Sequence, residues 1–456
     1  MSDIQAIVLA AGKGTRMRSS LPKVLHELAG KPMLVRILDT LARAGFACPL
    51  VVVDAGESRV RHVIGDRVHY VDQGERRGTG GAAAAALAAL PPATSRVLIV
   101  HGDEPLIEAA TYQEMLARQD ETGAPIVLLT THARDLRGFG RVIRGRDGRI
   151  EALVQEGDLT AEQRTVTEVN LGAYVICTGF LRGALERLRP HPPKGEYYLT
   201  DVIHEAVAAG ETVEAITVPG GEEIMGINDL SHLEHATRAI YRATARRLMA
   251  AGVTILDTAS TFVGDDVRIG SGTILSPFTI IEGNTVIGED CVIGPSAHIV
   301  SSRLGDRCQV LSSTVRDSSL ADDVRVGPYA HVRDGAVIGP HCEILTHAEI
   351  KGSRLGPGTK MHHFGYVGDA EIGANVNIGA GVVTCNFDGR TKHRTIVGNG
   401  AFLGSDTMLR APITIGDNAA TGAGSVVTHD VPANTTVAGV PARPLTSPES
   451  GERGEG

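Results

Sequence analysis

Residues 263–300 read VGDDVRIGSGTILSPFTIIEGNTVIGEDCVIGPSAHIV, with an aliphatic residue at every sixth position. These positions are Val263, Ile269, Leu275, Ile281, Ile287, Ile293 and Ile299. A period of six fits neither an α-helix, which has about 3.6 residues per turn, nor one continuous strand. It is typical of a chain that turns a corner every six residues and points the aliphatic residue inward at each corner. The pattern therefore predicts a left-handed parallel β-helix of hexapeptide repeats.

The same step returns twice further along the chain. It covers Val326, Val332, Ile338, Ile344 and Ile350, and then Val397, Leu403, Leu409 and Ile415. Glycine often follows the aliphatic residue, as at Gly270, Gly288, Gly339 and Gly416. Glycine suits corners that crowd a Cβ atom. A flexible glycine-rich region would not keep so many aliphatic residues in phase, so we expect stacked triangular coils around a narrow aliphatic column.

The composition limits the class of protein. A chain of 456 residues has room for two or three domains. Aromatic residues make up only 4%, and the net charge of −9 argues against general attraction to nucleic acid. The six cysteines form no CxxC motif, and we expect all of them to be reduced. Because we find neither a signal peptide nor a long apolar run, we expect a soluble cytoplasmic protein.

The N-terminal half alternates apolar runs with helical stretches. We expect strands at Ala6–Ala11, Leu50–Val53, Val97–Val100 and Ile126–Thr130, and helices at Pro32–Ala44 and Gly80–Leu90. This alternation predicts a mostly parallel, doubly wound α/β (Rossmann-like) sheet. Ligands of such sheets bind at the carboxyl ends of the strands.

Two ligand-binding places follow from this rule. The first is the glycine-rich turn Gly12–Met17, whose backbone N–H groups suit an anion; on spacing alone, phosphate binding and an ordinary turn remain equally open. The second is His101-Gly102-Asp103, where the Asp103 carboxylate suits Mg²⁺ bound to phosphates. The alternative for Asp103 is a cap on the next helix.

Four motifs of this half resemble those of the sugar-1-phosphate nucleotidyltransferases. They are LAAGKGTRM at 9–17, PKVLH at 22–26, GDEPL at 102–106 and GEYYLTD at 195–201. Together with the repeats, residues 4–440 resemble the bifunctional bacterial N-acetylglucosamine-1-phosphate uridyltransferase/glucosamine-1-phosphate acetyltransferases.

The resemblance implies a role for each matching residue of the first half. Residues implied to bind the uridine nucleotide are Leu9, Ala10, Ala11 and Gly12, with Arg16 and Lys23 near its phosphates, Gln73, Gly78 and Thr79 at the uracil, and His101 and Gly102 beside them. Residues implied to contact the sugar are Gly140, Gln155 and Asn170. Asp103 and Asn228 would hold Mg²⁺ through oxygen ligands. The implied reaction is attack by the phosphate of N-acetylglucosamine 1-phosphate on the α-phosphorus of UTP, which releases pyrophosphate and needs no general base.

The stretch LTHAEIKGSRLGPGTKMHHFGYVGDAEIGANVNIGAGVVTCNFDG, residues 345–389, carries the resemblance to the acetyltransferase half. Acetyl transfer to an amine needs a base, and histidine titrates near neutral pH. The match assigns that role to His363. Residues implied to bind the sugar phosphate are Arg333, Lys351, Tyr366, Asn377, Asn386 and Phe387, and those implied to border the acetyl-CoA groove are Ala380, Ser405 and Ala423. For a histidine alone, a surface position without function is the ordinary alternative.

Some positions depart from the family pattern. Gln155 stands where an acid is usual, and Phe387 replaces a frequent tyrosine. Val440 stands where some members have an arginine, and Arg443 could take the role of that arginine. The six-residue period also breaks at CNFDGRTKHRTI, residues 385–396, which we expect to loop out. Such loops reach a neighbouring subunit in hexapeptide acyltransferases, so the resemblance implies a homotrimer.

We therefore expect four parts. They are a uridyltransferase domain at 1–228, a linker helix at 229–252, an acetyltransferase β-helix at 253–445 and a disordered tail at 446–456. The predicted enzyme acetylates glucosamine 1-phosphate and then forms UDP-N-acetylglucosamine. Two alternatives remain: a monofunctional nucleotidyltransferase whose β-helix only trimerises it, and a sugar-nucleotide-binding regulatory protein without turnover.

Overall fold

The computed structural model describes residues 3–12, 14–75, 77–133, 136, 138–192, 195–219 and 226–445. It divides into two compact units, Met1–Ala239 and Ile240–Gly456. The predicted disordered tail lies outside the described residues. Helix α7 (Leu230–Ala250) crosses the division, and Asp229 caps its start because Asp229 Oδ1 accepts the His232 N–H at 2.9 Å. Gly252, with φ 91°, follows its end.

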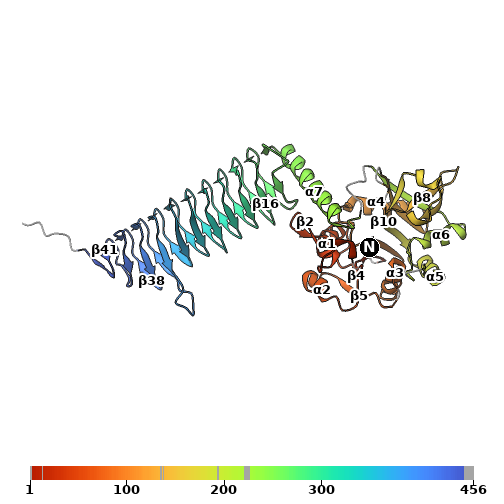
Figure 1. The fold of residues 1–456 in the computed structure, drawn as a ribbon, viewed down its shortest axis with the longest axis horizontal. Coiled ribbons are helices and arrows are strands. Elements are labelled where there is room, and N and C mark those ends of the chain that lie inside the picture. Colours follow the sequence, from red (N-terminus) through yellow and green to blue (C-terminus); the bar gives the residue numbers. More distant parts are fainter. Residues whose placement is uncertain are drawn as a thin grey trace, which may run out of the picture. The chain divides into compact units, whose positions relative to one another are not determined.

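The first unit is a mixed sheet with helices on both faces (Figure 1). Its strand order is β11-β7-β10-β6-β1-β4-β5, and β8 and β9 form a hairpin at the side of β10. The strands are β1 (Ile4–Leu9), β4 (Leu50–Val53), β5 (His69–Asp72), β6 (Arg96–His101), β7 (Ile126–His132), β8 (Arg141–Arg144), β9 (Ile150–Val154), β10 (Glu168–Cys177) and β11 (Val213–Val218), besides the small pair β2 (Glu27–Leu28) and β3 (Lys31–Pro32). Along the main order all neighbours are parallel except those of β10.

The helices cover the two faces of this sheet because the strand residues alternate between two cores. Val8, Val51 and Leu98 pack with one core, and Ile7, Val52 and Ile99 pack with the other. The first core takes residues of α1 (Met33–Arg43), α2 (Ser58–Ile64) and α4 (Ala109–Thr122), and the second takes residues of α3 (Thr79–Ala88), α5 (Thr178–Arg187) and α6 (Asp201–Ala208). The predicted doubly wound architecture is confirmed, although β1 ends at Leu9, so that Ala10 and Ala11 belong to the turn.

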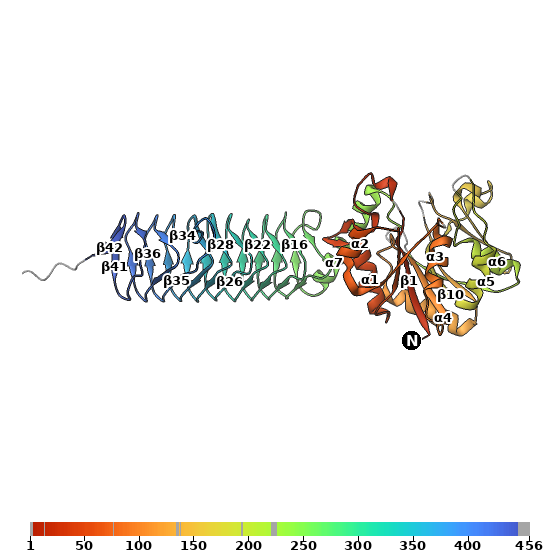
Figure 2. The ribbon, with the colours of Figure 1, turned by 90° about the horizontal axis from the view of Figure 1, so that it is seen from below.

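The second unit is a β-helix of three parallel sheets, seen side-on in Figure 2. Sheet I contains β12 (Thr254–Ile255), β15 (Ile274–Leu275), β18 (Val292–Ile293), β21 (Gln309–Val310), β24 (Arg325–Val326), β27 (Glu343–Ile344), β30 (Lys360–Met361), β33 (Asn377–Ile378), β36 (Phe402–Leu403), β39 (Ala420–Thr421), β41 (Thr436–Gly439) and, antiparallel at the end, β42 (Ala442–Pro444). Sheet II contains β13 (Phe262–Val263), β16 (Ile280–Glu282), β19 (His298–Val300), β22 (Thr314–Arg316), β25 (His331–Arg333), β28 (Ala348–Lys351), β31 (Gly365–Gly368), β34 (Val383–Cys385), β37 (Met408–Arg410) and β40 (Val426–Val427). Sheet III contains β14 (Arg268–Ile269), β17 (Val286–Ile287), β20 (Arg303–Leu304), β23 (Ser319–Leu320), β26 (Val337–Ile338), β29 (Arg354–Leu355), β32 (Ala370–Ile372), β35 (Thr395–Val397) and β38 (Ile413–Ile415).

The aliphatic column is buried as predicted, with every in-phase residue between 0% and 9% exposed. The prediction that these residues sit at corners is wrong, because they lie in the short strands that form the flat sides. Ile269, for example, is the last residue of β14 and pairs with Ile287 of β17 in the next coil. The chain turns after each such strand, and residues there with positive φ, such as Asp290, change its direction.

Glycine is needed directly after the aliphatic residue because successive coils pass very close there. A Cβ atom on Gly288 would lie 2.6 Å from the backbone carbon of Gly305, and one on Gly270 would lie 2.7 Å from that of Gly288. The six cysteines are all free thiols, as predicted, and Cys291, Cys308 and Cys342 are buried inside the coils. Among the described residues, none of the helices combines the length and apolar character that a membrane crossing requires.

Candidate active sites

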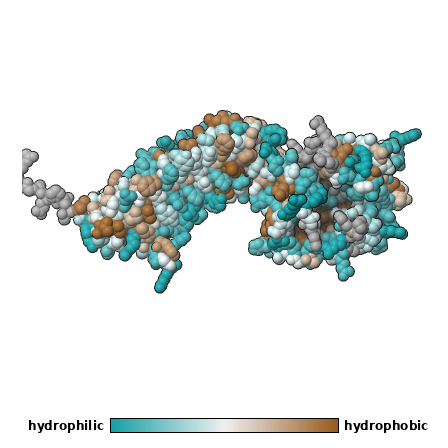
Figure 3. Space-filling model, viewed as in Figure 1, coloured by the Kyte–Doolittle hydropathy of each residue, from teal (hydrophilic) through white to brown (hydrophobic). Residues whose placement is uncertain are grey.

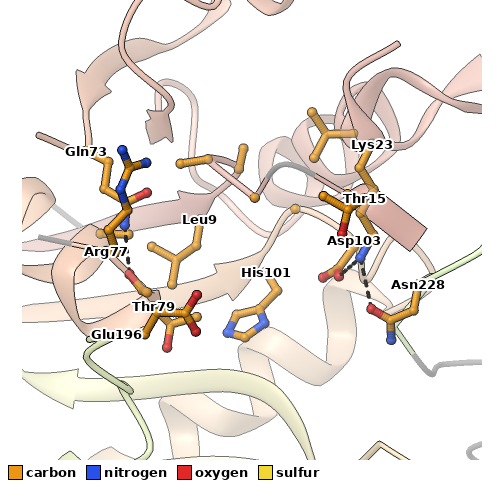
Figure 4. A pocket seen from close by; sticks show the side chains of 18 of the residues that line it. Leu9, Thr15, Lys23, Gln73, Arg77, Thr79, His101, Asp103, Glu196 and Asn228 are labelled. Atoms are coloured by element: carbon orange, nitrogen blue, oxygen red, sulfur yellow. Dashed lines mark hydrogen bonds and ion pairs between the residues drawn. The ribbon is translucent and has the colours of Figure 1, made fainter. Parts of the chain in front are cut away.

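The first unit holds a pocket of about 680 Å³ at the carboxyl ends of β1 and β6 (Figure 4). The two strands run parallel, with Leu9 opposite His101, so the turns that follow them lie side by side. The predicted residues that line the pocket are Leu9, Ala10, Ala11, Gly12, Arg16, Lys23, Gln73, Gly78, Thr79, His101, Gly102, Asp103 and Asn228. The structure thus brings together the glycine-rich turn and the His101–Asp103 segment.

Two glycines make this close approach possible. Gly14 has φ 56°, and a Cβ atom there would lie 2.6 Å from Cβ of Lys23. A Cβ atom on Gly102 would lie 3.1 Å from the Leu9 carbonyl oxygen. Because neither residue has a side chain, Lys23 and the end of β6 can approach the floor of the pocket.

Cationic side chains and oxygen atoms meet at one end of the pocket. Lys23 Nζ donates to Asp103 Oδ2 at 2.5 Å and to Asn228 Oδ1 at 3.0 Å (Figure 4). Arg16 also donates to Asn228 Oδ1, at 2.8 Å. Burial raises the pKa of Asp103, but the charges of Lys23 and His101 outweigh burial, and the pKa lies below its ordinary value. The Asp103 carboxylate and the Asn228 amide oxygen thus both contact the Lys23 ammonium group. Ligands of a divalent metal ion must converge on one cation in the same way.

Asp103 does not cap the next helix, so that alternative is wrong. Helix α4 begins at Ala109, with Glu108 at its N-cap position. Instead, the Asp103 carbonyl accepts the Ile227 N–H at 2.8 Å. This bond brings Asn228 beside the end of β6, although the two segments are far apart in the sequence.

The residues predicted to read uracil lie at the other end of the pocket. Gln73 donates to the Gly78 carbonyl at 2.9 Å, and Thr79 Oγ1 accepts the Leu199 N–H at 2.9 Å. A Cβ atom on Gly78 would lie 2.4 Å from the Tyr197 carbonyl oxygen. The start of α3 is therefore held against residues 197–199.

The three residues predicted to contact the sugar are not among the described residues that line the pocket. They lie near one another, on the β8–β9 hairpin and β10. The Asn170 N–H donates to the Gly140 carbonyl at 3.1 Å, and the Gln155 amide donates to Thr200 at 2.9 Å.

In the second unit, three of the residues predicted to bind the sugar phosphate (Arg333, Lys351 and Asn386) lie along one side of sheet II, where its strands end. Arg333 of β25 pairs in register with Lys351 of β28, and Lys351 pairs with Gly368 of β31. Lys351 Nζ lies 3.8 Å from Asp369 Oδ1, and Asn386 donates to Asp369 Oδ2 at 2.6 Å. Among residues 226–445, the Asn386 side-chain amide therefore contacts Asp369 and makes no hydrogen bond to His363.

His363 lies at the corner of the solenoid that precedes β31, on the side where the strands of sheet II begin. The residues predicted to border acetyl-CoA lie at the same corner. The Gly381 N–H donates to the Phe364 carbonyl at 2.7 Å, the Asp406 N–H to that of Ala380 at 2.6 Å, and the Gly424 N–H to that of Ser405 at 2.8 Å. Residues 363, 380, 405 and 423 therefore follow one another along one corner of the solenoid, and the His363 side chain is exposed.

A single chain does not collect all of its predicted acetyl-transfer residues. His363 lies before the start of β31, whereas Gly368, the register partner of Lys351, is the last residue of that strand. Asn377 lies on sheet I, a different face of the solenoid. The stretch from Asn386 to Arg394 projects as the blue loop in Figure 1, and it carries Phe387, whose side chain is exposed.

Comparison with known proteins identifies the family. The family described as MobA-like NTP transferase domain matches residues 6–212, and that described as bacterial transferase hexapeptide (six repeats) matches residues 266–301, 317–352 and 394–429. The "Bifunctional protein GlmU" of Exiguobacterium sibiricum is 44% identical over 94% of this chain and 96% of its own length. The chain belongs to the bifunctional GlmU family. Proteins of the same name from Heliobacterium modesticaldum and Carboxydothermus hydrogenoformans are 44% and 42% identical, over 94% of this chain and 93% and 96% of their own lengths.

Membership of the GlmU family confirms the predicted bifunctional transferase over the monofunctional alternative. The nucleotidyltransferase half of such a protein implies nucleotide substrates and a divalent metal. Both halves are present here, one with the pocket at the end of β6 and the other with the residues along sheet II.

The structure also adds site residues that the sequence motifs did not single out. Arg77, Glu196 and Tyr198 line the first-unit pocket. Glu196 and Tyr198 belong to the GEYYLTD motif, so attention to alternate residues of that motif could have found them. In the second unit, Lys392 lies beside Lys351, whose positive charge holds the pKa of Lys392 below its ordinary value. The position of Lys392 in the predicted loop did not by itself indicate a role in the site.

Proposed function

We propose that the second unit transfers acetyl from acetyl-CoA to glucosamine 1-phosphate, and that the first unit joins the product to UTP to form UDP-N-acetylglucosamine. The observation that carries the first-unit proposal is the convergence of Lys23, Asp103 and Asn228 at the carboxyl end of β6. The second-unit proposal is carried by the Arg333–Lys351 ladder along sheet II.

In uridylyl transfer the attacking phosphate oxygen is already anionic, so the protein supplies alignment and charge neutralisation. The uridine base lies against Gln73 and Thr79, while the phosphates extend toward Arg16 and Lys23. The cations stabilise the negative charge that builds up on the oxygens of the α-phosphate while pyrophosphate leaves.

Asp103 and Asn228 would hold Mg²⁺, because their oxygens converge on a position already occupied by an ammonium group. The ion would neutralise phosphate charge in the same pocket. With the ion on these oxygens, Lys23 would be free to bind the phosphates.

In acetyl transfer the amine of glucosamine 1-phosphate attacks the thioester carbonyl, and CoA leaves as the thiolate. His363 takes the proton of the attacking amine. Arg333, Lys351 and Lys392 neutralise the sugar phosphate, while the corner at Ala380, Ser405 and Ala423 supports acetyl-CoA.

We propose a homotrimer, because sheet II of one chain separates His363 from Lys351 and a neighbouring chain would bring the two groups together. Apolar side chains on the outside of the solenoid support this assembly (brown in Figure 3). Phe278, Tyr329, Phe364 and Phe402 are 68%, 64%, 58% and 53% exposed. Hexapeptide repeats themselves favour oligomers. The substrates UTP and acetyl-CoA agree with a cytoplasmic location.

The test is incubation of the purified protein with glucosamine 1-phosphate, acetyl-CoA, UTP and Mg²⁺, with the sugar followed by mass spectrometry. We expect UDP-N-acetylglucosamine. Unchanged glucosamine 1-phosphate would contradict the second-unit proposal, and failure to use supplied N-acetylglucosamine 1-phosphate would contradict the first. Light scattering at micromolar protein should give the mass of three chains, and a monomeric mass would contradict the trimer.

A further inference from the structure

Three side chains that can bind a metal meet at the first-unit pocket, which His101 and Asp103 line. His101, Asp103 and Glu104 each offer one ligand atom, and these atoms all lie within 4.8 Å of one another. His101 ends β6, and the backbone turns back so that the Glu104 N–H donates to the His101 carbonyl at 3.4 Å. This turn places the Glu104 carboxylate beneath the imidazole, with His101 Nδ1 4.0 Å from Glu104 Oε1.

Glu104 is a buried carboxylate, and one of its oxygens has no hydrogen-bond partner within the described part of the chain. The residue is 7% exposed, and this oxygen is Oε2. Nε2 of His101 is also buried without a partner among those residues. Lys23 bonds to Asp103 and so balances one of the two neighbouring carboxylates. A buried carboxylate without a partner is costly unless it binds a proton or a cation.

The space for Glu104 is provided by a glycine. Gly172 of β10 has φ 75°, and a Cβ atom there would lie 2.4 Å from Glu104 Oε1. A Cβ atom on Gly226, from the segment that carries Asn228, would lie 3.7 Å from Cγ of Glu104. The backbone thus leaves room for a carboxylate beside His101 and Asp103.

We propose that His101, Asp103 and Glu104 together bind a first-row transition-metal dication (Mn²⁺, Co²⁺ or Zn²⁺) in preference to Mg²⁺. Mg²⁺ favours oxygen ligands, whereas an imidazole nitrogen suits the transition metals. Bonds from such ions to nitrogen and oxygen are about 2.0–2.2 Å, so the ligands of one tetrahedral ion lie about 3.3–3.6 Å apart. The three ligand atoms lie within 4.8 Å of one another here, so binding an ion needs them to approach by up to about 1.5 Å.

This inference goes beyond the proposed function, which gives neither His101 nor Glu104 a metal role. It shares only Asp103 with the Mg²⁺ ligands proposed above. Metal binding by these three residues can be tested without substrate. A negative result in that test would not contradict the proposed reactions.

The experiment is a titration of the full-length, chelator-treated protein with Mn²⁺ and no nucleotide, in which free Mn²⁺ is followed by electron paramagnetic resonance. We expect the parent to bind Mn²⁺, and excess Mg²⁺ to displace it poorly. Glu104→Gln and His101→Gln should each raise the Kd for Mn²⁺ at least about tenfold. Asn228→Ala is the matched control: it removes a Mg²⁺ ligand of the proposed function and should leave the Kd for Mn²⁺ unchanged.

A second readout reports the nitrogen ligand directly. Electron spin-echo modulation from a metal-bound nitrogen should be present in the parent and absent in His101→Gln. Thermal unfolding of each variant shows whether it is folded. No binding of Mn²⁺ by the folded parent would overturn the inference. So would a Kd that rises in Asn228→Ala but not in Glu104→Gln, since the ion would then occupy only the Asp103–Asn228 site. UDP-N-acetylglucosamine formation with Mg²⁺, measured separately, tests the proposed function by itself.

Discussion

Replacement of Lys23 by methionine removes the cation that bonds to Asp103 and Asn228 at one end of the first-unit pocket, and it keeps most of the apolar stem of the side chain. Lys23 Nζ bonds to both Asp103 and Asn228, and the side chain is 11% exposed. A cation in so enclosed a place acts on phosphate charge with little screening by water. We therefore expect uridylyl transfer to depend strongly on it.

The magnitude follows from the loss of one preorganised donor in an enclosed site, about 2.7–4 kcal/mol of transition-state stabilisation. This corresponds to a fall in kcat of about 10²–10³-fold. The second unit contains none of these residues, so acetyl transfer should stay at the parent rate.

The assay measures pyrophosphate release from UTP and N-acetylglucosamine 1-phosphate, and acetyl transfer in the same sample shows that the chain is folded. Lys31→Met is the matched control, because Lys31 pairs with Asp39 outside the pocket at 3.1 Å and its loss should leave both activities unchanged. A fall in uridylyl transfer of less than about tenfold in Lys23→Met would refute the reasoning. Equal falls of both activities would also contradict it.

Three further predictions concern the proposed general base His363, the close contact between coils at Gly288, and the ion pair of Arg144 with Glu168. His363→Ala should lower acetyl transfer by about 10²–10⁴-fold, as expected for a lost general base, and leave uridylyl transfer unchanged. Gly288→Ala should destabilise the second unit by about 1–3 kcal/mol in urea unfolding, because its Cβ atom would collide with the Gly305 backbone. For Glu168, burial raises the pKa, but the hydrogen bonds from Arg144 outweigh burial and hold it below its ordinary value. Glu168→Gln should therefore cost about 1–3 kcal/mol at neutral pH. That difference should shrink as the pH falls below about 4, since protonation removes the same interaction from the parent.

Each of these has an outcome that would contradict it. Acetyl transfer that survives in His363→Ala would mean that another group takes the proton. An unchanged urea midpoint in Gly288→Ala would show that the coils can separate locally without cost. For the ion pair, a Glu168→Gln penalty of the same size at low and neutral pH would point to lost packing instead of lost charge.

The β-helix could be predicted from the sequence because its repeat is short and its core is a single column. Burial at every sixth residue leaves a period that no helix or lone strand produces, and each buried aliphatic residue confirmed it. The position of these residues on the flat sides was missed, since a period alone does not say which residue of the repeat turns. The turns depend on positive φ at residues such as Asp290, and on the clearance at Gly288.

The first-unit pocket was predicted in part. The turn after β1 and the end of β6 are each recognisable from a local motif, and the parallel register of Leu9 with His101 brings them together. Glu196 and Tyr198 were missed because their motif indicates family membership but does not show which of its residues line the pocket. Glu104 was also missed, because nothing local shows that a surface-type residue will be buried beneath a histidine.

The sequence by itself determined the two halves of this protein, its doubly wound sheet and solenoid, and the residue types of both candidate sites. These features are local or periodic, so neighbouring residues carry enough information to specify them. Only the tertiary structure decided which distant residues meet: Lys23 with Asp103 and Asn228, and Glu104 with His101 and Gly172. It also separated His363 from Lys351 across sheet II. Such distances depend on register, turns and the clearance between backbones, which are properties of the packed chain as a whole.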